Sequence, residues 1–281
     1  MPSRRRLLRV VAVALIMTAA PWPRASAGAP DPIQFILIQP GSPGTTEEAA
    51  PVMARLADYL AARLPGHPPV RGLYVNTPED AAVAVVRTKP RLGIVTLPYY
   101  LEQRTRHNLR PQLATRPGGR TEDRYRLLVA SANTASSWEE LRGIIAGPLC
   151  HNADGAARLT FQRSAAELPF QCQPTERLLR AARRVIRGEL SGVLVTDEQF
   201  ASLTALGEGK QLRVLHETAP LPPPLVVTFG EPDAPLHAII QILLGMKDDP
   251  AAGELRSELR TDGFGPVDTA AIDALHRRMA P

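Results

Sequence analysis

The residues best suited to chemistry lie in one short stretch, from Cys150 to Asp154. Cys150 is followed directly by His151, and this pair could provide an activated thiolate nucleophile or two ligands for a soft metal ion. Asn152 and Asp154 add an amide and a carboxylate. The six histidines of the chain are scattered, and no Met or His cluster accompanies the pair. Catalysis, metal binding and a structural role therefore all remain open for this stretch.

The second cysteine, Cys172, favours the structural role for Cys150. Cys150 follows an apolar strand expected at residues 144–149, and Cys172 falls in the next expected strand, at 170–173. Neighbouring strands of a sheet lie about 5 Å apart, which would bring the two sulfur atoms within reach. In an exported protein such a pair persists as a disulfide, and closing a loop of this size stabilises a fold by about 3 kcal/mol. We therefore predict a Cys150–Cys172 disulfide.

Export is indicated by the first 27 residues. They combine a cluster of arginines, an apolar run at residues 10–20 and the small residues Ala25, Ser26 and Ala27, which is the pattern of a cleaved signal peptide. The apolar run is too short to span a bilayer, which takes about 20 residues. General secretion and the twin-arginine route both fit this segment. We expect the mature protein to be soluble in the periplasm or an equivalent extracytoplasmic space.

The basic character of the whole chain resides in that signal. The 281 residues have a formal net charge of +5, and five of the 33 basic residues lie among the first 27. Without them the mature chain has 28 basic and 28 acidic residues. A neutral chain gives no electrostatic reason to expect a nucleic-acid partner. A hydrophobic content of 44% is typical of a globular protein, which excludes disordered and collagen-like classes.

Strands and helices alternate along the mature chain, which predicts an α/β fold. Apolar, β-rich runs are followed by turn residues and then by helical periodicity. Cys150 to Gly155 is expected to be a loop that leads into a helix ending near Phe161. The expected strands are 33–39, 70–75, 92–97, 125–130, 144–149, 170–173, 192–195, 212–216 and 225–229. The main expected helices are 46–64, 78–86, 176–187, 235–246, 251–259 and 268–279, and residues 263–266 are expected to form a turn.

Two interruptions divide the chain into lobes. A polar, glycine-rich segment at 116–123 precedes an extended run, and four prolines at 220–224 form a stiff connection. We interpret both as hinge crossovers between two lobes, each a mostly parallel sheet flanked by helices. Lobe 1 would comprise residues 28–122 and 223–281, and lobe 2 residues 123–222. Ligands of such sheets bind beyond the carboxyl ends of the strands, so the loops there should face one cleft.

The order of these segments resembles a known family. The similarity runs over essentially the whole mature chain and includes the crossover strand at Tyr125. The other segments that show the similarity are IQP (38–40), MARLADYLAARL (53–64), RLGIVTLPYYL (91–101), SWEELRG (137–143), SGVLVTDEQF (191–200), LRVLHETAPLPPPLVV (212–227) and DGFGPVDTAAIDAL (262–275). In these segments the chain resembles the phosphate/phosphite/phosphonate ABC-transporter substrate-binding proteins, which have the type 2 periplasmic binding protein fold.

This resemblance implies transport and not catalysis. Two lobes would close by a hinge motion on a small-molecule solute, a phosphonate-like oxyanion or another polar solute, and deliver it to an ABC permease at the membrane. It also implies a monomer with no catalytic residues, no metal site and no cofactor. Two alternatives stay open. One is an enzyme on the same bilobal scaffold that uses Cys150 and His151, and the other is a periplasmic sensor or accessory protein without its own permease.

The predicted solute-binding residues are the polar groups at the loop ends. Tyr99 follows an apolar strand where the resembled family has a ligand-facing residue, and tyrosine offers both a flat apolar face and a hydroxyl. Turn or helix-cap roles are the alternatives for Ser42, Asn76 and Asp197. The predicted set is Gln39, Ser42, Asn76, Thr96, Tyr99 and Tyr100 from lobe 1, with His151, Asn152, Asp154, Thr196 and Asp197 from lobe 2.

The loop at 150–155 departs from the resembled family. Phosphonate binders typically have a Ser-Thr-Ser-Gly pattern there, whose hydroxyls and N–H groups hold the oxyanion. This chain has Asn152 and Asp154 instead. An ionised Asp154 about 4 Å from a phosphonate would cost on the order of 4 kcal/mol. We therefore expect no phosphonate binding, and either a cation, an amine or a polyhydroxylated solute at this loop, or a helix cap formed by Asp154.

Overall fold

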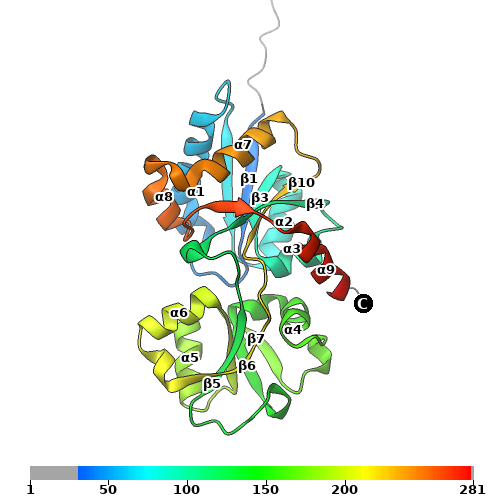
Figure 1. Cartoon of the computed structure of the whole chain (residues 1–281), viewed down its shortest axis with the longest axis vertical. Helices are drawn as coiled ribbons and strands as arrows, with labels where there is room; N and C mark the ends of the chain where they lie inside the picture. The colour runs from blue at the N-terminus through cyan, green and yellow to red at the C-terminus, as the bar shows by residue number, and fades with distance from the viewer. Residues whose placement is uncertain (1–30, 280–281) are drawn as a thin grey trace, which may run out of the picture. The chain divides into compact units, whose positions relative to one another are not determined.

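Two mixed β-sheets organise the part of the chain that the structure, a computed structural model, describes, residues 31–279 (Figure 1). The predicted signal peptide lies outside these residues. The first sheet has the strand order β11-β4-β10-β3-β1-β2, and the second has the order β7-β6-β8-β5-β9. The first consists of β1 (Ile33–Ile38), β2 (Val70–Val75), β3 (Leu92–Val95), β4 (Leu109–Thr115), β10 (Leu225–Phe229) and β11 (Phe264–Pro266). The second consists of β5 (Tyr125–Ala130), β6 (Ile144–Gly147), β7 (Gln171–Pro174), β8 (Gly192–Thr196) and β9 (Leu212–Glu217).

Helices cover both faces of each sheet. On the first sheet, α1, α7 and α8 pack on one face and α2, α3 and α9 on the other (Figure 1). On the second sheet, α5 and α6 pack on one face and α4 on the other. Within residues 31–279 no helix is both long enough and apolar enough to cross a membrane. The bounds are α1 (Thr46–Arg63), α2 (Pro78–Thr88), α3 (Leu97–Gln103), α4 (Ala153–Phe161), α5 (Leu178–Ile186), α6 (Asp197–Ala205), α7 (Ala234–Gly245), α8 (Gly253–Glu258) and α9 (Thr269–Met279).

Local sequence explains how the first helices begin. Thr45 and Glu48 form a reciprocal capping box at the start of α1, which satisfies backbone N–H groups that have no partner within the helix. Thr77 caps α2, and Pro78 follows at a position where a missing N–H costs nothing. Each helix thus begins shortly after the carboxyl end of a strand. The loops that follow β1 and β2 are held at one edge of the sheet as a result.

The predicted α/β fold with two sheets and two crossovers is confirmed, but the expectation of mostly parallel sheets is wrong. β10 runs antiparallel to β3 and β4, and β5 runs antiparallel to β8 and β9. The connections explain why. The chain leaves the first sheet after β4 and returns to it at β10, so the end of β4 and the start of β10 must lie at the same edge. When β4 and β10 pair antiparallel, the end of one lies beside the start of the other, so the chain can cross between the sheets with short segments. The antiparallel pair β5 and β9 has the same role in the second sheet.

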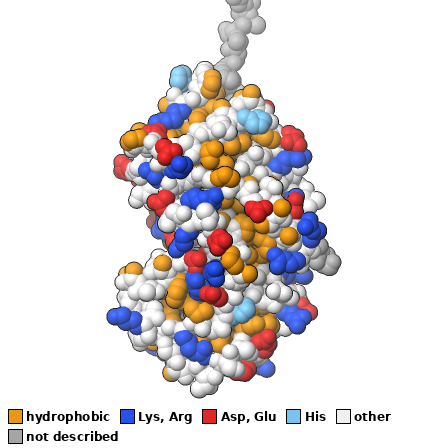
Figure 2. Space-filling model, in the orientation of Figure 1, with side chains coloured by type: hydrophobic (Ala, Val, Ile, Leu, Met, Phe, Trp, Pro, Cys, Tyr) orange, Lys and Arg blue, Asp and Glu red, His pale blue; other side chains and the backbone are white. Residues whose placement is uncertain are grey.

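The two crossing segments contact each other. Asp123 and Leu221 form an antiparallel bridge, with N–O distances of 2.8 and 2.9 Å in the two directions. Ion pairs join the adjoining strands: Arg126 and Arg124 both pair with Glu217. Figure 2 shows side chains of both charges beside one another in the middle of the view, where these segments lie. The passage between the sheets is therefore a paired two-stranded connection.

Three segments differ from the sequence prediction. Strand β4 was not expected, because its centre reads Arg-Pro-Gln and lacks apolar alternation. Residues 264–266 form β11 and not a turn, since their backbone pairs with β4. The expected loop after β6 is a 3₁₀ helix over Pro148–Asn152 that continues into α4.

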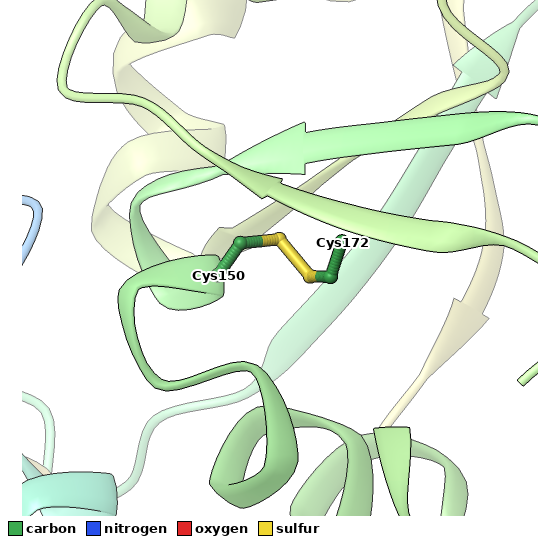
Figure 3. Close-up of a disulfide and its surroundings, with 2 residues drawn as sticks. All are labelled: Cys150 and Cys172. Carbon is green, nitrogen blue, oxygen red and sulfur yellow. A yellow bond between two sulfur atoms is a disulfide. The ribbon is translucent and has the colours of Figure 1, made fainter. Parts of the chain in front are cut away.

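The predicted disulfide is confirmed. Cys150 in the 3₁₀ helix and Cys172 in β7 are bonded, with their Cα atoms 5.4 Å apart (Figure 3). β7 pairs in parallel with β6, the strand that leads into the 3₁₀ helix. The bond therefore fastens the start of α4 to the edge strand of the second sheet.

Candidate functional site

A cavity of about 490 Å³ lies between the two sheets. One wall comes from the loop after β1 and the first turns of α1, where Ala49, Val52 and Met53 present apolar side chains. The opposite wall comes from the 3₁₀ helix, the start of α5 and the first turns of α6, and the crossing segments close the end between them. The cavity is thus formed by segments far apart in the sequence.

The ends of three strands meet at this cavity. Gln39 follows β1, Thr96 follows β3 and Thr196 ends β8, and all three line the cavity together with Ser42. This is the arrangement expected for loops beyond the carboxyl ends of parallel strands. Four of the predicted solute-binding residues are therefore brought together in one place.

A smaller pocket of about 70 Å³ lies beside the cavity. Thr96 lines both, whereas the predicted residues Tyr99 and Asn152 line only the small pocket. Tyr99 is 5% exposed, and burial raises the pKa of its hydroxyl to about 12. Asn152 caps α4 through its side-chain oxygen and donates a hydrogen bond from Nδ2 to the Glu102 carboxylate. These contacts join α4 to α3 across the two sheets.

Gly41, which lines the larger cavity, lies against Pro148, which lines both hollows. Gly41 has a φ of +80°, and a Cβ at this position would lie 2.6 Å from the Pro148 Cα. Asn76 fixes the loop that carries Gly41, because its Nδ2 donates to the carbonyl oxygens of Ser42 and Gly44 at 3.2 and 2.7 Å. Asn76 therefore positions the loop and does not line the cavity itself.

Other predicted residues also lie outside both hollows. Tyr100 has no exposed surface and packs in the core of the first sheet. The Nε2 atom of His151 is buried and has no partner within residues 31–279. Asp197 pairs with Arg126 and donates its backbone N–H to Asp123. Their roles as solute ligands stay predictions without support from the cavity geometry.

Asp154 also lies outside both hollows. Its carboxylate pairs with Arg158 at 2.7 Å and accepts the backbone N–H of Ala165 at 2.9 Å. These bonds lower the pKa of Asp154, with the Arg158 hydrogen bond as the main cause. The ionised Asp154 carboxylate is therefore paired with Arg158 on α4 and lines neither hollow. The N-terminus of α4 is capped by Asn152 and not by Asp154.

Acidic residues outnumber arginines around the cavity. The charged lining residues are Arg120 and Arg260 against Glu122, Asp123, Glu176, Glu198 and Glu258. Two of the five acids are paired: Glu258 with Arg55, and Glu198 with Arg260 at 3.8 Å. Within residues 31–279, Glu122, Glu176 and Arg120 form no ion pair. The cavity thus has a negative excess.

Asp123 lies where the crossing segments meet the cavity. Its Oδ1 accepts the backbone N–H groups of Arg124 at 2.8 Å and Asp197 at 3.0 Å. Burial raises the pKa of this carboxyl to about 6, a rise that the hydrogen bond from Arg124 only partly opposes. Asp123 therefore joins the crossing segment to the start of α6.

Two hydroxyls remain available at the cavity wall. Thr115, at the end of β4, is 6% exposed and its Oγ1 has no partner within residues 31–279. Thr96 precedes α3 but makes no capping hydrogen bond, whereas Thr196 caps α6 in a box with Gln199. A buried hydroxyl without a partner is costly. Thr115 therefore indicates a position where a ligand or water completes the hydrogen bonding.

Several cavity residues were missed by sequence reasoning. Thr115 follows a strand that was not predicted. Glu176 and Leu178 follow β7, so the same carboxyl-end rule applied to the predicted strand at 170–173 would have found them. Arg120 and Asp123 lie in the predicted crossover, where glycine and charge indicated only a linker. Within residues 31–279, no group of three or more His, Cys, Asp or Glu is arranged to hold a metal ion.

A family model described as "ABC transporter, phosphonate, periplasmic substrate-binding protein" matches residues 43–272. The chain belongs to this family. As a substrate-binding protein of an ABC transporter, it places its cavity between two sheets, where proteins of this fold close on a solute. The family membership predicted from the sequence is confirmed. A search of the curated proteins finds no significant match.

Solved structures share the fold of this substrate-binding protein. XAC2383 from Xanthomonas citri bound to ATP is 18% identical, with a TM-score of 0.69 over 88% of this chain and 97% of that one. A binding protein component of an ABC phosphonate transporter from Pseudomonas aeruginosa is 10% identical, with a TM-score of 0.65 over 88% and 87%. PhnD1 from Prochlorococcus marinus in complex with methylphosphonate is 9% identical, with a TM-score of 0.66 over 88% and 97%. At these identities the similarity shows the fold alone.

Proposed function

We propose that the exported protein captures a small polar solute in the cavity between its sheets and delivers it to an ABC permease as a monomer. Residues 28–122 and 223–281 would move as one lobe and residues 123–222 as the other. The signal peptide at 1–27 would direct the protein to the periplasm or an equivalent compartment. Closure around the solute would exclude water and present a closed surface to the permease.

The observation that carries this proposal is a cavity lined from both sheets and bounded by the paired crossing segments. Two crossings paired through Asp123 and Leu221 are short enough to act as one hinge. Contacts already span the cavity, because Gly41 abuts Pro148 and Arg260 lies 3.8 Å from Glu198. A solute bound between these groups would favour the closed arrangement over the open one.

The same geometry supports binding without catalysis. A cysteine nucleophile needs a free thiolate, and Cys150 is in a disulfide. His151 is adjacent in sequence, but it lines neither hollow. Counting thiols in the unreduced mature protein tests this part directly. We expect none, and one reactive thiol at Cys150 would favour the enzymatic alternative.

Thermal denaturation of the mature protein against a solute panel tests capture. The panel contains oxyanions, amines, amino acids, sugars and divalent metals, because a solute that binds only the folded state raises Tm by mass action. We expect one class to raise Tm in a saturable manner and to reduce the radius of gyration in small-angle scattering, as lobe closure requires. A panel that leaves both quantities unchanged would reject solute capture.

A transport assay tests delivery. Cells that lack this gene should lose uptake of the bound solute and recover it with the wild-type gene. Uptake that persists without the protein, although the solute binds it, would favour the sensor or accessory alternative over delivery to a permease.

A further inference from the structure

The cavity has an available carboxylate on one wall and an apolar surface on the other. Glu176 forms no ion pair within residues 31–279, yet its charge acts on Tyr74 of the opposite wall: burial and the Glu176 carboxylate together raise the pKa of Tyr74 to about 12. Tyr74 is 5% exposed and donates to the carbonyl oxygen of Pro43 at 3.2 Å. Glu176 therefore lines the cavity as an exposed carboxylate without an ion pair, and it also borders a second hollow lined by Arg177, Arg180, Arg183 and Arg187.

Prolines reduce the number of backbone N–H donors at the same place. Six lining residues are prolines, which have no backbone N–H to offer: Pro40, Pro43, Pro117, Pro148, Pro223 and Pro224. The start of α6 is already satisfied by Thr196 and Asp123. Arg120 is the one lining cation without an ion pair among residues 31–279, against three such carboxylates, Glu122, Asp123 and Glu176. An oxyanion would thus meet an excess of carboxylates at this wall.

The remaining wall favours an aliphatic group. Leu37, Ala49, Val52 and Met53 line one side of the cavity, and Leu178 and Leu259 also contribute. The unpartnered hydroxyl of Thr115 belongs to this side, because Leu113, two residues earlier on the same face of β4, packs in the cluster that contains Leu37 and Met53. An apolar chain could contact this wall while a polar group of the solute reaches Thr115.

We propose that the solute is an organic cation, an ammonium group on an aliphatic chain, whose charge is held by Glu176 and supported by Glu122. This inference rests on the proposed function and specifies the solute of the same cavity. An ammonium group donates up to three hydrogen bonds and accepts none, which suits a site of carboxylates. A methylphosphonate dianion would need the opposite arrangement.

Titration calorimetry with the mature protein tests the solute class. The probes are hexylamine and putrescine against methylphosphonate and inorganic phosphate, in low-salt buffer at pH 7. We expect at least one amine to bind at least tenfold more tightly than either oxyanion, and its affinity to fall as salt screens the charges. An oxyanion that binds as tightly as the amines would overturn the inference and leave solute capture intact. The inference would also be overturned, with solute capture intact, if only a neutral solute from the thermal-denaturation panel bound the protein.

Variants test the residue assignment. Glu176→Gln should weaken amine binding by about tenfold, which corresponds to 1.4 kcal/mol. The control is Glu139→Gln, an exposed carboxylate in the same part of the chain that does not line the cavity. Thr115→Val, which keeps the side-chain shape, should weaken binding by a smaller factor. Amine affinity that is equal in Glu176→Gln and Glu139→Gln would overturn the role of Glu176. If no solute of any class binds, the proposed function fails together with this inference.

Discussion

The two sides of the junction between the sheets are built differently. On one side α4 packs against the first sheet: Leu159 is 8% exposed and belongs to the same apolar cluster as Tyr100 and Ile272. A pocket of about 70 Å³ lies on this side. On the other side α1 and α6 are separated by the cavity of about 490 Å³, lined by charged and apolar groups together.

This difference shows which side can receive a solute. Buried apolar side chains join the sheets where α3, α4 and α9 meet. Each Å² of apolar surface removed from water there stabilises the contact by about 25 cal/mol. On the cavity side, the residues that the structure describes form no apolar cluster that joins the two sheets. A solute can supply the missing contacts, so binding energy is available there for closure, whereas the packed side would have to lose contacts to open.

The 3₁₀ helix over Pro148–Asn152 contributes to both sides. Pro148 contacts Gly41 at the cavity, and Asn152 bonds Glu102 on the packed side. The disulfide from Cys150 fixes this short element to β7. The same element therefore positions both halves of the junction.

Loss of the disulfide should have the largest effect on this arrangement. Cys150→Ala with Cys172→Ala opens a loop of 22 residues and should lower the free energy of unfolding by about 3 kcal/mol, since the unfolded chain gains entropy. Urea denaturation measures the change. Each single variant, and the reduced wild type, should lose a similar amount. A double variant as stable as the oxidised wild type would show that packing alone fixes the 3₁₀ helix.

Asp123 should make the hinge sensitive to pH. Its folded-state pKa of about 6 lies above the ordinary value of 3.8, so the folded state holds the proton more tightly than the unfolded state does. The resulting stability is fully present below pH 4 and is lost as pH rises through 6. We expect this loss to be about 2 kcal/mol, reduced from the full shift because the carboxyl is not entirely buried. Arg120, Arg126 and Glu198 modulate the same carboxyl.

Asp123→Asn tests this dependence. The amide oxygen can still accept hydrogen bonds from the two backbone N–H groups, but the amide cannot ionise. The free energy of unfolding, measured by urea denaturation, should therefore no longer fall between pH 4 and 7 by the amount that Asp123 contributes. At pH 7 the variant should equal or exceed the wild type. Asp58→Asn, at an exposed position on α1, is the control and should keep the wild-type profile. A profile of Asp123→Asn that matches the control would exclude titration at the hinge.

Leu159→Ala should weaken the packed side. A buried Leu→Ala substitution costs about 2–5 kcal/mol, and the low end is expected because Leu159 lies at the rim of its cluster. Leu206→Ala removes the same atoms from a residue that is 64% exposed and should change stability by about 0.5 kcal/mol or less. The difference between the two variants in thermal or urea denaturation measures the apolar contact between the sheets. Equal effects would mean that this contact contributes little.

Much of the fold could be predicted because its strands are locally explicit. β1, β5 and β10 are apolar runs bounded by turn residues, and their positions were predicted within one residue. β4 could not be recognised from the sequence, because Arg110, Pro111 and Gln112 lack the apolar alternation of a strand. This strand forms because it pairs with β10 and β11. The antiparallel pairs were missed for a related reason: strand direction follows from where the chain crosses, which is a property of the whole fold.

The candidate site was predictable in position but not in detail. The carboxyl-end rule found Gln39, Thr96 and Thr196, yet two of these threonines have different roles. Thr196 is followed three residues later by Gln199, which completes a capping box, whereas the same position after Thr96 is Tyr99, which cannot reciprocate. This difference between the two threonines can be predicted from the sequence. The role of Asp154 is harder to predict, because an i,i+4 ion pair with Arg158 competes with any contact between Asp154 and a ligand.

The contact of Gly41 with Pro148 offers the finest test of the cavity side. A Cβ on Gly41 would overlap the Pro148 backbone, so Gly41→Ala should hold the two walls apart and weaken solute binding by about tenfold, or 1.4 kcal/mol. Gly66→Ala is the matched control, because Gly66 has a similar φ of +74° but nothing within 4 Å of its added Cβ. Both variants pay the cost of a left-handed backbone, about 1–2 kcal/mol in stability. Only Gly41→Ala should lose affinity and closure, measured by calorimetry and small-angle scattering with the solute identified in the panel. Equal affinity in the two variants would mean that solute binding does not need Gly41 to reach Pro148, and the cavity would then close by a different contact.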